Sequence, residues 1–326
     1  MILAGDIGGT STRLAVFKVH NGRFQTVVEE TYPSREYKDF DEVVSLFVSE
    51  HQFPVEHACF GIAGPVRHGC VEASNLPWIV DAGHLARKLN VKTVDLLNDL
   101  EANAYGIATL EADDFVALNQ GAPPAIGNAA VIAAGTGLGE AGLYWDGAQH
   151  RPFACEGGHA DFAPQNELQV ELLLYLRKKF GHVSWERVVS GPGLRNLYEF
   201  LRDTGRGEEP AWLTEDMRSE DPPVVITRAG LEGRSALCED ALDLFVSLYG
   251  AEAGNLALKI MATHAVFVSG GIAPKIIQKL QGPAFMEAFA AKGRFKWLLE
   301  TMPVRVVLNN KTALFGAARY AMLHKG

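Results

Sequence analysis

The hydrophobic residues of this chain follow two alternating patterns along its length. Short apolar runs bounded by Gly, Asn or Pro, such as residues 2–4 and 130–134, are typical of buried strands. Other segments, such as residues 40–48, place apolar side chains about every 3.6 positions, which predicts amphipathic helices. Because strand and helix patterns alternate, the sequence predicts an α/β layer architecture.

The two patterns define the expected elements. We predict strands over residues 2–4, 14–17, 23–32, 57–63, 93–97, 130–134, 141–144, 265–268 and 304–308. We predict helices over residues 40–48, 82–89, 100–110, 168–180, 193–201, 224–230, 235–262 and 313–323. Helices therefore dominate the second half of the chain.

The length and the distribution of breakers predict two domains. A chain of 326 residues with 48% hydrophobic residues is long enough for two cores of ordinary size. Gly and Pro cluster in residues 121–128, which indicates a boundary. We predict a smaller α/β domain over residues 1–110 and a larger α/β domain over residues 111–310. The last helix, at about residues 311–326, is expected to pack back on the smaller domain.

Two glycine-rich turns of the same design are the most informative motifs. Residues 6–10 read Asp-Ile-Gly-Gly-Thr and residues 135–139 read Gly-Thr-Gly-Leu-Gly, and each turn joins two predicted strands. The second strand of each pair runs into a hairpin signal, Asn21-Gly22 in one case and Asp146-Gly147 in the other. A whole supersecondary unit is therefore repeated.

Two interpretations of these turns are open. Glycine is common in ordinary hairpins. Glycine also lets backbone N–H groups approach a phosphate closely, and the hydroxyl and carboxylate groups among these glycines suit a phosphate with its Mg²⁺. The repetition favours the second interpretation. Neither turn is a Walker P-loop, and neither opens a helix as a Rossmann turn would.

Asn98-Asp99 is the first candidate for catalysis. The pair follows the predicted strand 93–97 and precedes a predicted helix. In open α/β sheets, ligands bind outside the carboxyl ends of the strands, so Asp99 is well placed for chemistry. Position alone favours a simple helix N-cap at Asp99. The two roles can coexist, because a carboxylate has two oxygens.

The other candidate residues lie in three short segments. Residues 156–162 read Glu-Gly-Gly-His-Ala-Asp-Phe, which suits hydrogen bonding to a polyol or a purely structural loop better than zinc, since HExxH and cysteine ligands at finger spacing are absent. Glu186 by itself has the pattern of the first turn of a helix capped by Ser184. Gly270-Gly271 either borders a flat ligand such as adenine or forms a tight strand-to-helix turn.

Charge and cysteine content narrow the class of protein. A net charge of −9 without a long basic run argues against nucleic acid as a partner. The four cysteines lack CxxC spacing, which argues against a zinc site and a disulfide framework and predicts a reducing, cytoplasmic location. The first residues do not form a secretory signal, and no apolar stretch approaches the roughly 20 residues that span a bilayer, so we expect neither secretion nor a membrane.

Taken in order, these motifs resemble those of bacterial glucokinases. The matching segments are residues 5–10, 97–99, 134–139, 156–164, 186–194 and 269–274, so the resemblance covers nearly the whole chain. It implies the actin-like ATPase (ribonuclease H-like) fold, with a cleft between a smaller and a larger α/β domain that are related by duplication. Ser11 stands where many relatives have Asn, and Leu100 where Phe is frequent. Both positions flank the motifs. Zinc-containing sugar kinases and repressors carry a cysteine-rich cluster after Gly-His, where this chain has residues 160–164, so the resemblance implies no zinc.

The resemblance also implies an activity and its residues. The activity is ATP-dependent phosphorylation of D-glucose at the 6-hydroxyl, giving glucose 6-phosphate for glycolysis, with Asp99 as the general base. The residues implied for sugar binding are Asn98, Asp99, Glu156, His159 and Glu186. The residues implied for nucleotide binding are Gly5, Asp6, Ile7, Gly8, Gly9, Thr10, Gly135, Thr136, Gly137, Gly270 and Gly271. Asp6 is expected to orient Mg²⁺ through water.

The resemblance also implies ligands and an assembly, and it leaves alternative activities open. We expect glucose and ATP as the ligands and a homodimer as the assembly. The alternatives are a kinase for another hexose (mannose, fructose or an N-acetylated amino sugar) and a catalytically inactive sugar-binding regulator. ADP or polyphosphate is an alternative donor.

Overall fold

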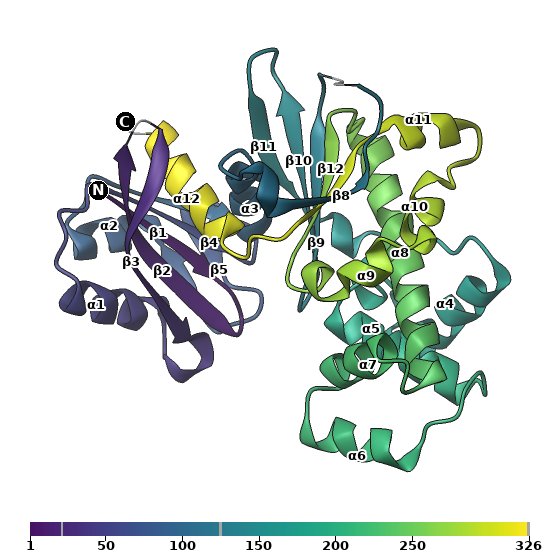
Figure 1. Cartoon of the computed structure of the whole chain (residues 1–326). Helices are drawn as coiled ribbons and strands as arrows, with labels where there is room; N and C mark the ends of the chain where they lie inside the picture. Colours follow the sequence, from purple (N-terminus) through teal and green to yellow (C-terminus); the bar gives the residue numbers. More distant parts are fainter. Residues whose placement is uncertain (21, 124–125, 325–326) are drawn as a thin grey trace. The chain divides into compact units, whose positions relative to one another are not determined.

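Each glycine-rich turn joins two strands of its own mixed sheet in the computed structural model (Figure 1). The structure describes residues 1–20, 22–123 and 126–324. It divides into two units. The first comprises residues 1–114, 151–154 and the chain from 309 onward, and the second comprises residues 115–150 and 155–308.

The sheet of the first unit has the order β3-β2-β1-β4-β7. The antiparallel part is formed by β1 (Ile2–Ile7), β2 (Ser11–His20) and β3 (Arg23–Pro33). Next to β1, β4 (His57–Ile62) and β7 (Thr93–Asn98) continue the sheet in parallel. Two short strands, β5 (Cys70–Glu72) and β6 (Ile79–Asp81), form a separate pair.

Helices cover both faces of this sheet, because side chains alternate along β1. Leu3 and Ile7 pack with residues of α1 (Phe40–Glu50) and α2 (Ala82–Leu89), whereas Ile2 and Ala4 pack with α3 (Asp99–Ile107) and α12 (Thr312–Leu323). The last two helices approach closely at Gly106, where a Cβ would overlap the Thr312 carbonyl.

The second sheet has the order β11-β10-β9-β12-β13-β8. Its strands are β8 (Phe115–Asn119), β9 (Ala129–Ala134), β10 (Leu138–Trp145), β11 (His150–Cys155), β12 (Ala265–Ser269) and β13 (Val304–Val307). The helices of this unit are α4 (Glu167–Phe180), α5 (Gly191–Asp203), α6 (Ala211–Ser219), α7 (Pro222–Leu231), α8 (Ala236–Ile260), α9 (Ile277–Leu280), α10 (Pro283–Ala290) and α11 (Lys296–Thr301). Across the described ranges, no helix is both long and apolar enough to cross a membrane.

The two sheets repeat one topology. Strands β11-β10-β9-β12-β13 follow the same order as β3-β2-β1-β4-β7, and β8 is added antiparallel to β13 at the edge. The repeated unit predicted from the glycine turns is therefore confirmed. Of the two hairpin signals, Asp146-Gly147 connects β10 with β11, and Gly147 takes a φ of +97°. In the other signal, Asn21 lies outside the described residues.

The predicted strands and long helices are confirmed, with small shifts at their ends. The helix predicted over residues 100–110 begins at Asp99 and ends at Ile107. Sequence patterns missed β5, β6, β8, α6, α10 and α11, and they indicated β11 and α9 only through the hairpin signal at Asp146-Gly147 and the turn at Gly270-Gly271. Pro152 lies within β11, and a proline argues against a strand except at a sheet edge, which is where β11 lies.

Candidate active site

The carboxyl ends of three parallel strands lie side by side in the first unit. The register aligns Ile7 of β1 with Ile62 of β4, and Ile62 with Asn98 of β7. The first glycine turn follows Ile7, and Asp99 follows Asn98. The turn and the Asn98-Asp99 pair therefore both lie at the carboxyl ends of the parallel strands, where open α/β folds bind ligands.

The first turn is held by residues that the sequence motifs did not indicate. The Gly8 N–H donates to the Ser11 carbonyl at 3.0 Å and closes the turn. Ser34 Oγ donates to the Gly8 carbonyl at 2.8 Å, and the Ser34 N–H donates to the Thr10 carbonyl at 3.1 Å. The hydroxyl of buried Thr12 lies 2.9 Å from that of buried Ser34. The conformation of the turn is thus fixed from β2 and from the 3₁₀ helix η1 (Ser34–Glu36), which follows β3.

Asn98, not Asp99, is the N-cap of α3. Asn98 Oδ1 accepts hydrogen bonds from the Leu100 N–H at 2.9 Å and the Glu101 N–H at 3.4 Å. Asp99 occupies the first helical position, where its Oδ1 accepts from the Leu100 N–H at 3.0 Å. The interpretation of Asp99 as the cap is therefore wrong, because the residue with extended backbone before the helix is Asn98.

Asp6 lies at the end of β1 opposite Arg13. Burial raises the pKa of the Asp6 carboxyl, and the Arg13 charge opposes this rise. Mg²⁺ is commonly held by one or two carboxylates together with phosphate oxygens and water. Within the part of the chain that the structure describes, His, Cys, Asp and Glu side chains form no group of three or more able to hold a metal. A single carboxylate beside the first glycine turn would fit Mg²⁺ that is held mainly by phosphate oxygens and water.

In the second unit, the segment around Ser190 supports the second glycine turn. The Gly135 N–H donates to the Gly137 carbonyl at 2.8 Å, and the Gly135 carbonyl accepts from the Gly191 N–H at 2.8 Å. Ser190 is the N-cap of α5, where its Oγ accepts from the Gly193 N–H at 3.0 Å. The Ser-Gly-Pro-Gly segment, unremarkable by composition, therefore contacts the turn directly.

Leu138 connects the second turn to both segments expected to bind sugar. Its N–H donates to Glu186 Oε2 at 3.0 Å. A Cβ on Gly158 would overlap the Leu138 carbonyl, so the 3₁₀ helix η3 (Gly157–His159) packs on the turn. Glu156 immediately precedes η3, and the side chains of Glu156 and His159 are exposed.

The two segments expected to bind sugar also pair with each other. The Trp185 N–H donates to the Ala160 carbonyl at 3.0 Å, and the Phe162 N–H donates to the Val183 carbonyl at 3.0 Å. The Phe162 and Trp185 rings meet edge to face, with centroids 5.1 Å apart. The segments that carry Glu186 and Glu156 are therefore packed together. Their separation of 30 positions in the sequence gives no indication of this contact.

The helix expected to begin near Glu186 is only a 3₁₀ turn. This turn is η4 (Trp185–Arg187), and Ser184 makes no side-chain capping hydrogen bond to any residue that the structure describes. The capped-helix interpretation of Glu186 is therefore wrong. Its carboxylate accepts instead from the second glycine turn.

Gly270-Gly271 lies beside the start of the second turn. Gly270 has a φ of +87°, and a Cβ there would overlap the backbone of Ala134. The buried Tyr249 hydroxyl accepts from the Ala134 N–H at 3.1 Å and donates to the Ser269 carbonyl at 3.2 Å. These contacts join the ends of β9 and β12. The tight-turn interpretation holds, and the role beside adenosine stays a prediction.

Removing the Ser190 hydroxyl is expected to destabilise the second unit. Ser190→Ala loses the cap of α5 and the 2.7 Å bond from Ser190 Oγ to the Glu186 carbonyl. The free energy of unfolding should fall by about 0.5 to 2 kcal/mol, as measured by urea denaturation. Ser190→Thr keeps a capping hydroxyl and serves as the control. Equal stability of Ser190→Ala and wild type would contradict this role.

The residues expected to bind nucleotide and sugar thus fall into two sets, one in each unit. The first unit holds Gly5, Asp6, Ile7, Gly8, Gly9, Thr10, Asn98 and Asp99, and the second holds Gly135, Thr136, Gly137, Glu156, His159, Glu186, Gly270 and Gly271. Sequence reasoning missed four residues that support the turns, namely Thr12, Ser34, Ser190 and Tyr249. Ser190 lies in the matching segment 186–194, but no supporting role followed from that motif, and the other three lie outside the matching segments.

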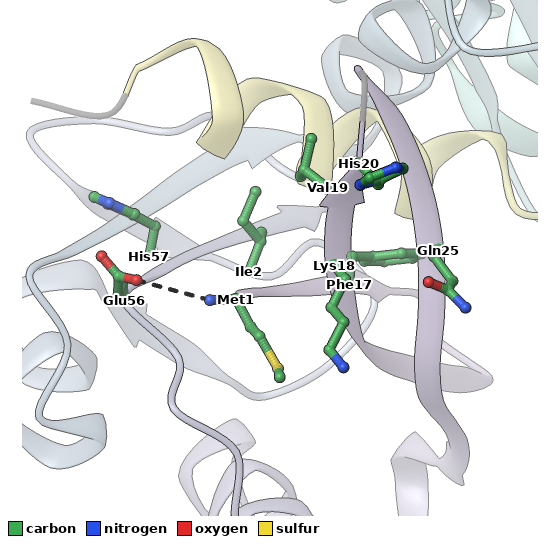
Figure 2. Close-up of a pocket in the computed structure, with 9 residues that line it drawn as sticks. All are labelled: Met1, Ile2, Phe17, Lys18, Val19, His20, Gln25, Glu56 and His57. Atoms are coloured by element: carbon green, nitrogen blue, oxygen red, sulfur yellow. Dashed lines mark ion pairs between the residues drawn. The ribbon is translucent and has the colours of Figure 1, made fainter.

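A pocket of about 400 Å³ lies at the opposite end of the first sheet, near the amino ends of its parallel strands (Figure 2). It lies where β1 and β4 begin and includes Met1, Glu56 and His57. The Met1 amino group lies 3.9 Å from Glu56 Oε1. None of the expected site residues lines this pocket, so it is separate from the candidate active site.

Comparison with known proteins identifies the family. The family model described as Glucokinase matches residues 3–324. A glucokinase from Nostoc sp. is 40% identical over 334 residues, covering 98% of each chain. The chain belongs to the glucokinase family. This membership confirms the resemblance that the ordered motifs indicate.

Solved structures of glucokinases share the fold. The crystal structure of a glucokinase from an Antarctic psychrotroph has a TM-score of 0.85 and 28% identity, covering 99% of this chain and 98% of that chain. A ROK family glucokinase from Streptomyces griseus, solved in complex with glucose and AMPPNP, has a TM-score of 0.66 and 19% identity, covering 99% of each chain. The predicted α/β fold of the actin-like ATPase class is confirmed for this member of the glucokinase family.

Proposed function

We propose that this member of the glucokinase family transfers the γ-phosphoryl group of ATP to the 6-hydroxyl of D-glucose. The observation that carries the proposal is that the second glycine turn, Glu186 and η3 meet at Leu138. A sugar kinase requires a phosphate site next to a polyol site. The Nostoc relative is a glucokinase, and the Streptomyces glucokinase was solved with glucose and an ATP analogue, which supports this choice of sugar and donor.

In this proposal, Asp99 is the general base. The sugar 6-oxygen attacks the γ-phosphorus, and the hydroxyl proton passes to the Asp99 carboxylate. The new O–P bond forms as the bond from the γ-phosphorus to the bridging oxygen of ATP breaks, which releases ADP. Asn98 fixes the first turn of α3, so Asp99 is held at a helix N-terminus.

Glu156, His159 and Glu186 are proposed to bind the sugar hydroxyls together with Asn98. Carboxylate oxygens accept from hydroxyls, and a neutral imidazole donates or accepts. Glu186 Oε2 accepts from the Leu138 N–H, so we assign Oε1 to the sugar. Because this carboxylate would contact both the sugar and the second turn, sugar binding is expected to influence the position of the turn.

The two turns are proposed to hold the nucleotide phosphates. Their backbone N–H groups and the hydroxyls of Thr10 and Thr136 supply donors, and Gly270-Gly271 borders the adenosine. Asp6 is the residue proposed to hold Mg²⁺, through water. When bound, Mg²⁺ would neutralise charge on the phosphates. Positioning and charge stabilisation supply most of the rate in phosphoryl transfer, so these donors matter as much as the base.

Neutralising Glu156 or removing the His159 ring is expected to weaken glucose binding. Glu156→Gln and His159→Ala each leave a hydroxyl with a poorer partner, at about 1 to 3 kcal/mol in the binding free energy. Isothermal titration calorimetry with glucose measures this loss. Exposed Glu167→Gln, at the start of α4, removes an equal charge and should bind as wild type does. Unchanged affinity in both site variants would reject the assignment.

A coupled ADP-release assay across sugars with ATP, and an assay of glucose 6-phosphate formation across donors, test the proposal. We expect kcat/KM to be highest for glucose among glucose, mannose, fructose and N-acetylglucosamine, and highest for ATP among ATP, ADP and polyphosphate. A higher kcat/KM for another hexose would reassign the substrate. Sugar binding without ADP release would favour a regulator.

We also propose that the protein acts in the cytoplasm as a homodimer. Cys59, Cys70, Cys155 and Cys238 are free thiols, the form that a reducing compartment maintains. The homodimer rests on the sequence resemblance. Sedimentation equilibrium is expected to give twice the chain mass, and a monomer at micromolar concentration would contradict it.

A further inference from the structure

Two buried acidic side chains lie beneath the proposed sugar-binding loop. Glu140 follows the second glycine turn on β10 and is 1% exposed, and Glu252 on α8 is 0% exposed. The two carboxyl groups lie close enough to interact directly. Buried carboxyl groups are costly unless they are paired, and neither residue takes part in the proposed chemistry. The pair therefore calls for its own explanation.

Glu140 reaches the sugar loop at Gly157. A Cβ at Gly157 would overlap the carboxyl group of Glu140 and would lie 3.4 Å from its Cβ. Gly157 stands between Glu156 and His159 on η3. The carboxyl group of Glu140 thus packs directly against the backbone of η3 at Gly157. A change in the charge or position of this carboxyl group is therefore expected to shift η3.

The neighbouring polar groups stabilise a negative charge on Glu252. Asn255 Nδ2 donates to Glu252 Oε2 at 2.8 Å, and Lys259 Nζ lies 3.5 Å from Glu252 Oε1. Lys292 Nζ donates to Asn255 Oδ1 at 2.7 Å and so extends the network. Glu140 Oε1 and Glu252 Oε1 are both buried without a hydrogen-bond partner among the described residues, but only Glu252 has Asn255 and Lys259 beside its carboxyl group in this network. The pair is therefore arranged with the charge on Glu252 and the proton on Glu140.

Burial raises the pKa of both carboxyl groups, and Asn255 and Lys259 oppose the rise at Glu252. Burial raises the pKa of Glu140 to about 8, and the charge of Glu252 adds to the rise while Lys259 opposes it. Two carboxyl groups in contact cannot easily both ionise. The other titratable groups facing Glu140 are Cys155 and Tyr249, whose pKa values burial raises. Beyond them, Glu156 adds negative charge near Cys155, and burial lowers the pKa of Lys292.

We propose that Glu140, while it holds its proton, positions the Glu156–His159 loop, so that loss of this proton weakens sugar binding. The inference rests on the proposed sugar-binding role of that loop. Ionised Glu140 places a second negative charge beside Glu252 and beneath η3, and displacement of η3 relieves the repulsion. Glu140 does not touch the sugar, so it is a positioning residue.

The pH profile of the KM for glucose tests this inference. For the wild type, we expect a constant KM at neutral pH and a rise above about pH 8 that approaches tenfold per pH unit, as expected when one proton is linked to binding. The kcat should change much less over the same range. Glu140→Gln keeps a hydrogen-bond donor toward Glu252 and has no proton to lose. Its KM should be near the wild-type value at pH 7 and flat to about pH 9.5.

A matched control and a second readout make the test specific. Exposed Glu287→Gln on α10 removes a charge from the same unit and should keep the wild-type profile. Calorimetric titrations with glucose near pH 8.5, in buffers of different ionisation enthalpy, should show proton uptake by the wild type and none by Glu140→Gln. The wild-type titration stands by itself if the variant does not fold.

Three results decide the matter. A flat wild-type KM, or glucose binding without proton uptake, overturns the inference. A rise in KM that persists in Glu140→Gln also overturns it and assigns the effect to Lys292 or Cys155. A protein that phosphorylates glucose with a flat profile refutes only the role of Glu140, whereas a protein that phosphorylates no glucose at any pH refutes the proposed function itself.

Discussion

Replacing Asp99 by Asn is expected to lower kcat for glucose phosphorylation by about 10²- to 10⁴-fold, the usual contribution of a general base. Asn keeps the shape of the side chain and an oxygen that can accept from the Leu100 N–H, so the start of α3 should stay intact. It cannot take up the proton of the sugar hydroxyl. Steady-state kinetics should show the loss in kcat, and calorimetry should show nearly unchanged glucose affinity.

A matched variant separates this effect from a general loss of charge. Asp113 is exposed in the 3₁₀ helix η2 (Ala112–Asp114), beyond the C-terminal end of α3. Asp113→Asn should leave kcat unchanged. Near-normal turnover by Asp99→Asn would remove Asp99 from the role of base, and a large loss of glucose affinity would make it a binding residue instead.

Replacing Gly270 by Ala is expected to damage both stability and nucleotide binding. The φ of +87° strains an L-residue by about 1 to 2 kcal/mol, and the added Cβ would overlap the backbone of Ala134. Ala134 directly precedes the second glycine turn, so any shift that relieves the overlap displaces the turn. A loss of about 1 to 2 kcal/mol in ATP binding would raise the KM for ATP about 5- to 30-fold. Thermal denaturation and steady-state kinetics measure the two effects.

The adjacent glycine offers the control. A Cβ at Gly271 meets no protein atom within 4 Å among the described residues, and its φ is outside the left-handed region. Gly271→Ala should therefore fold with wild-type stability. If adenosine borders this position, the KM for ATP rises in Gly271→Ala without a change in stability. Wild-type stability of Gly270→Ala would contradict the account of this turn.

Much of the fold is predictable because burial imposes periodicity. The apolar run before each glycine turn and the long apolar stretch of α8 identify their elements without tertiary information. Contacts between distant segments leave no such trace. Ser34 holds Gly8 from 26 positions away, and Tyr249 holds Ala134 from 115 positions away. A serine or tyrosine in an ordinary element gives no sign of such a partner.

The candidate site shows the same limit. The position of Asp99 follows from the end of a strand, whereas the relation of Glu186 to Leu138 depends on how two loops pack. Glu140 is a sharper case. A charged residue in a strand suggests a solvent-exposed face, and only the arrangement of Glu252 on α8 explains its burial. Sequence reasoning therefore finds the reacting groups more readily than the groups that position them.

Identification of the product tests the central claim most directly. The purified protein is incubated with ATP, Mg²⁺ and D-glucose, and the product is examined by ³¹P and ¹H nuclear magnetic resonance. The account predicts glucose 6-phosphate and ADP in equal amounts. ADP without a sugar phosphate, a phosphoryl group on another hydroxyl, or no reaction with glucose would contradict it.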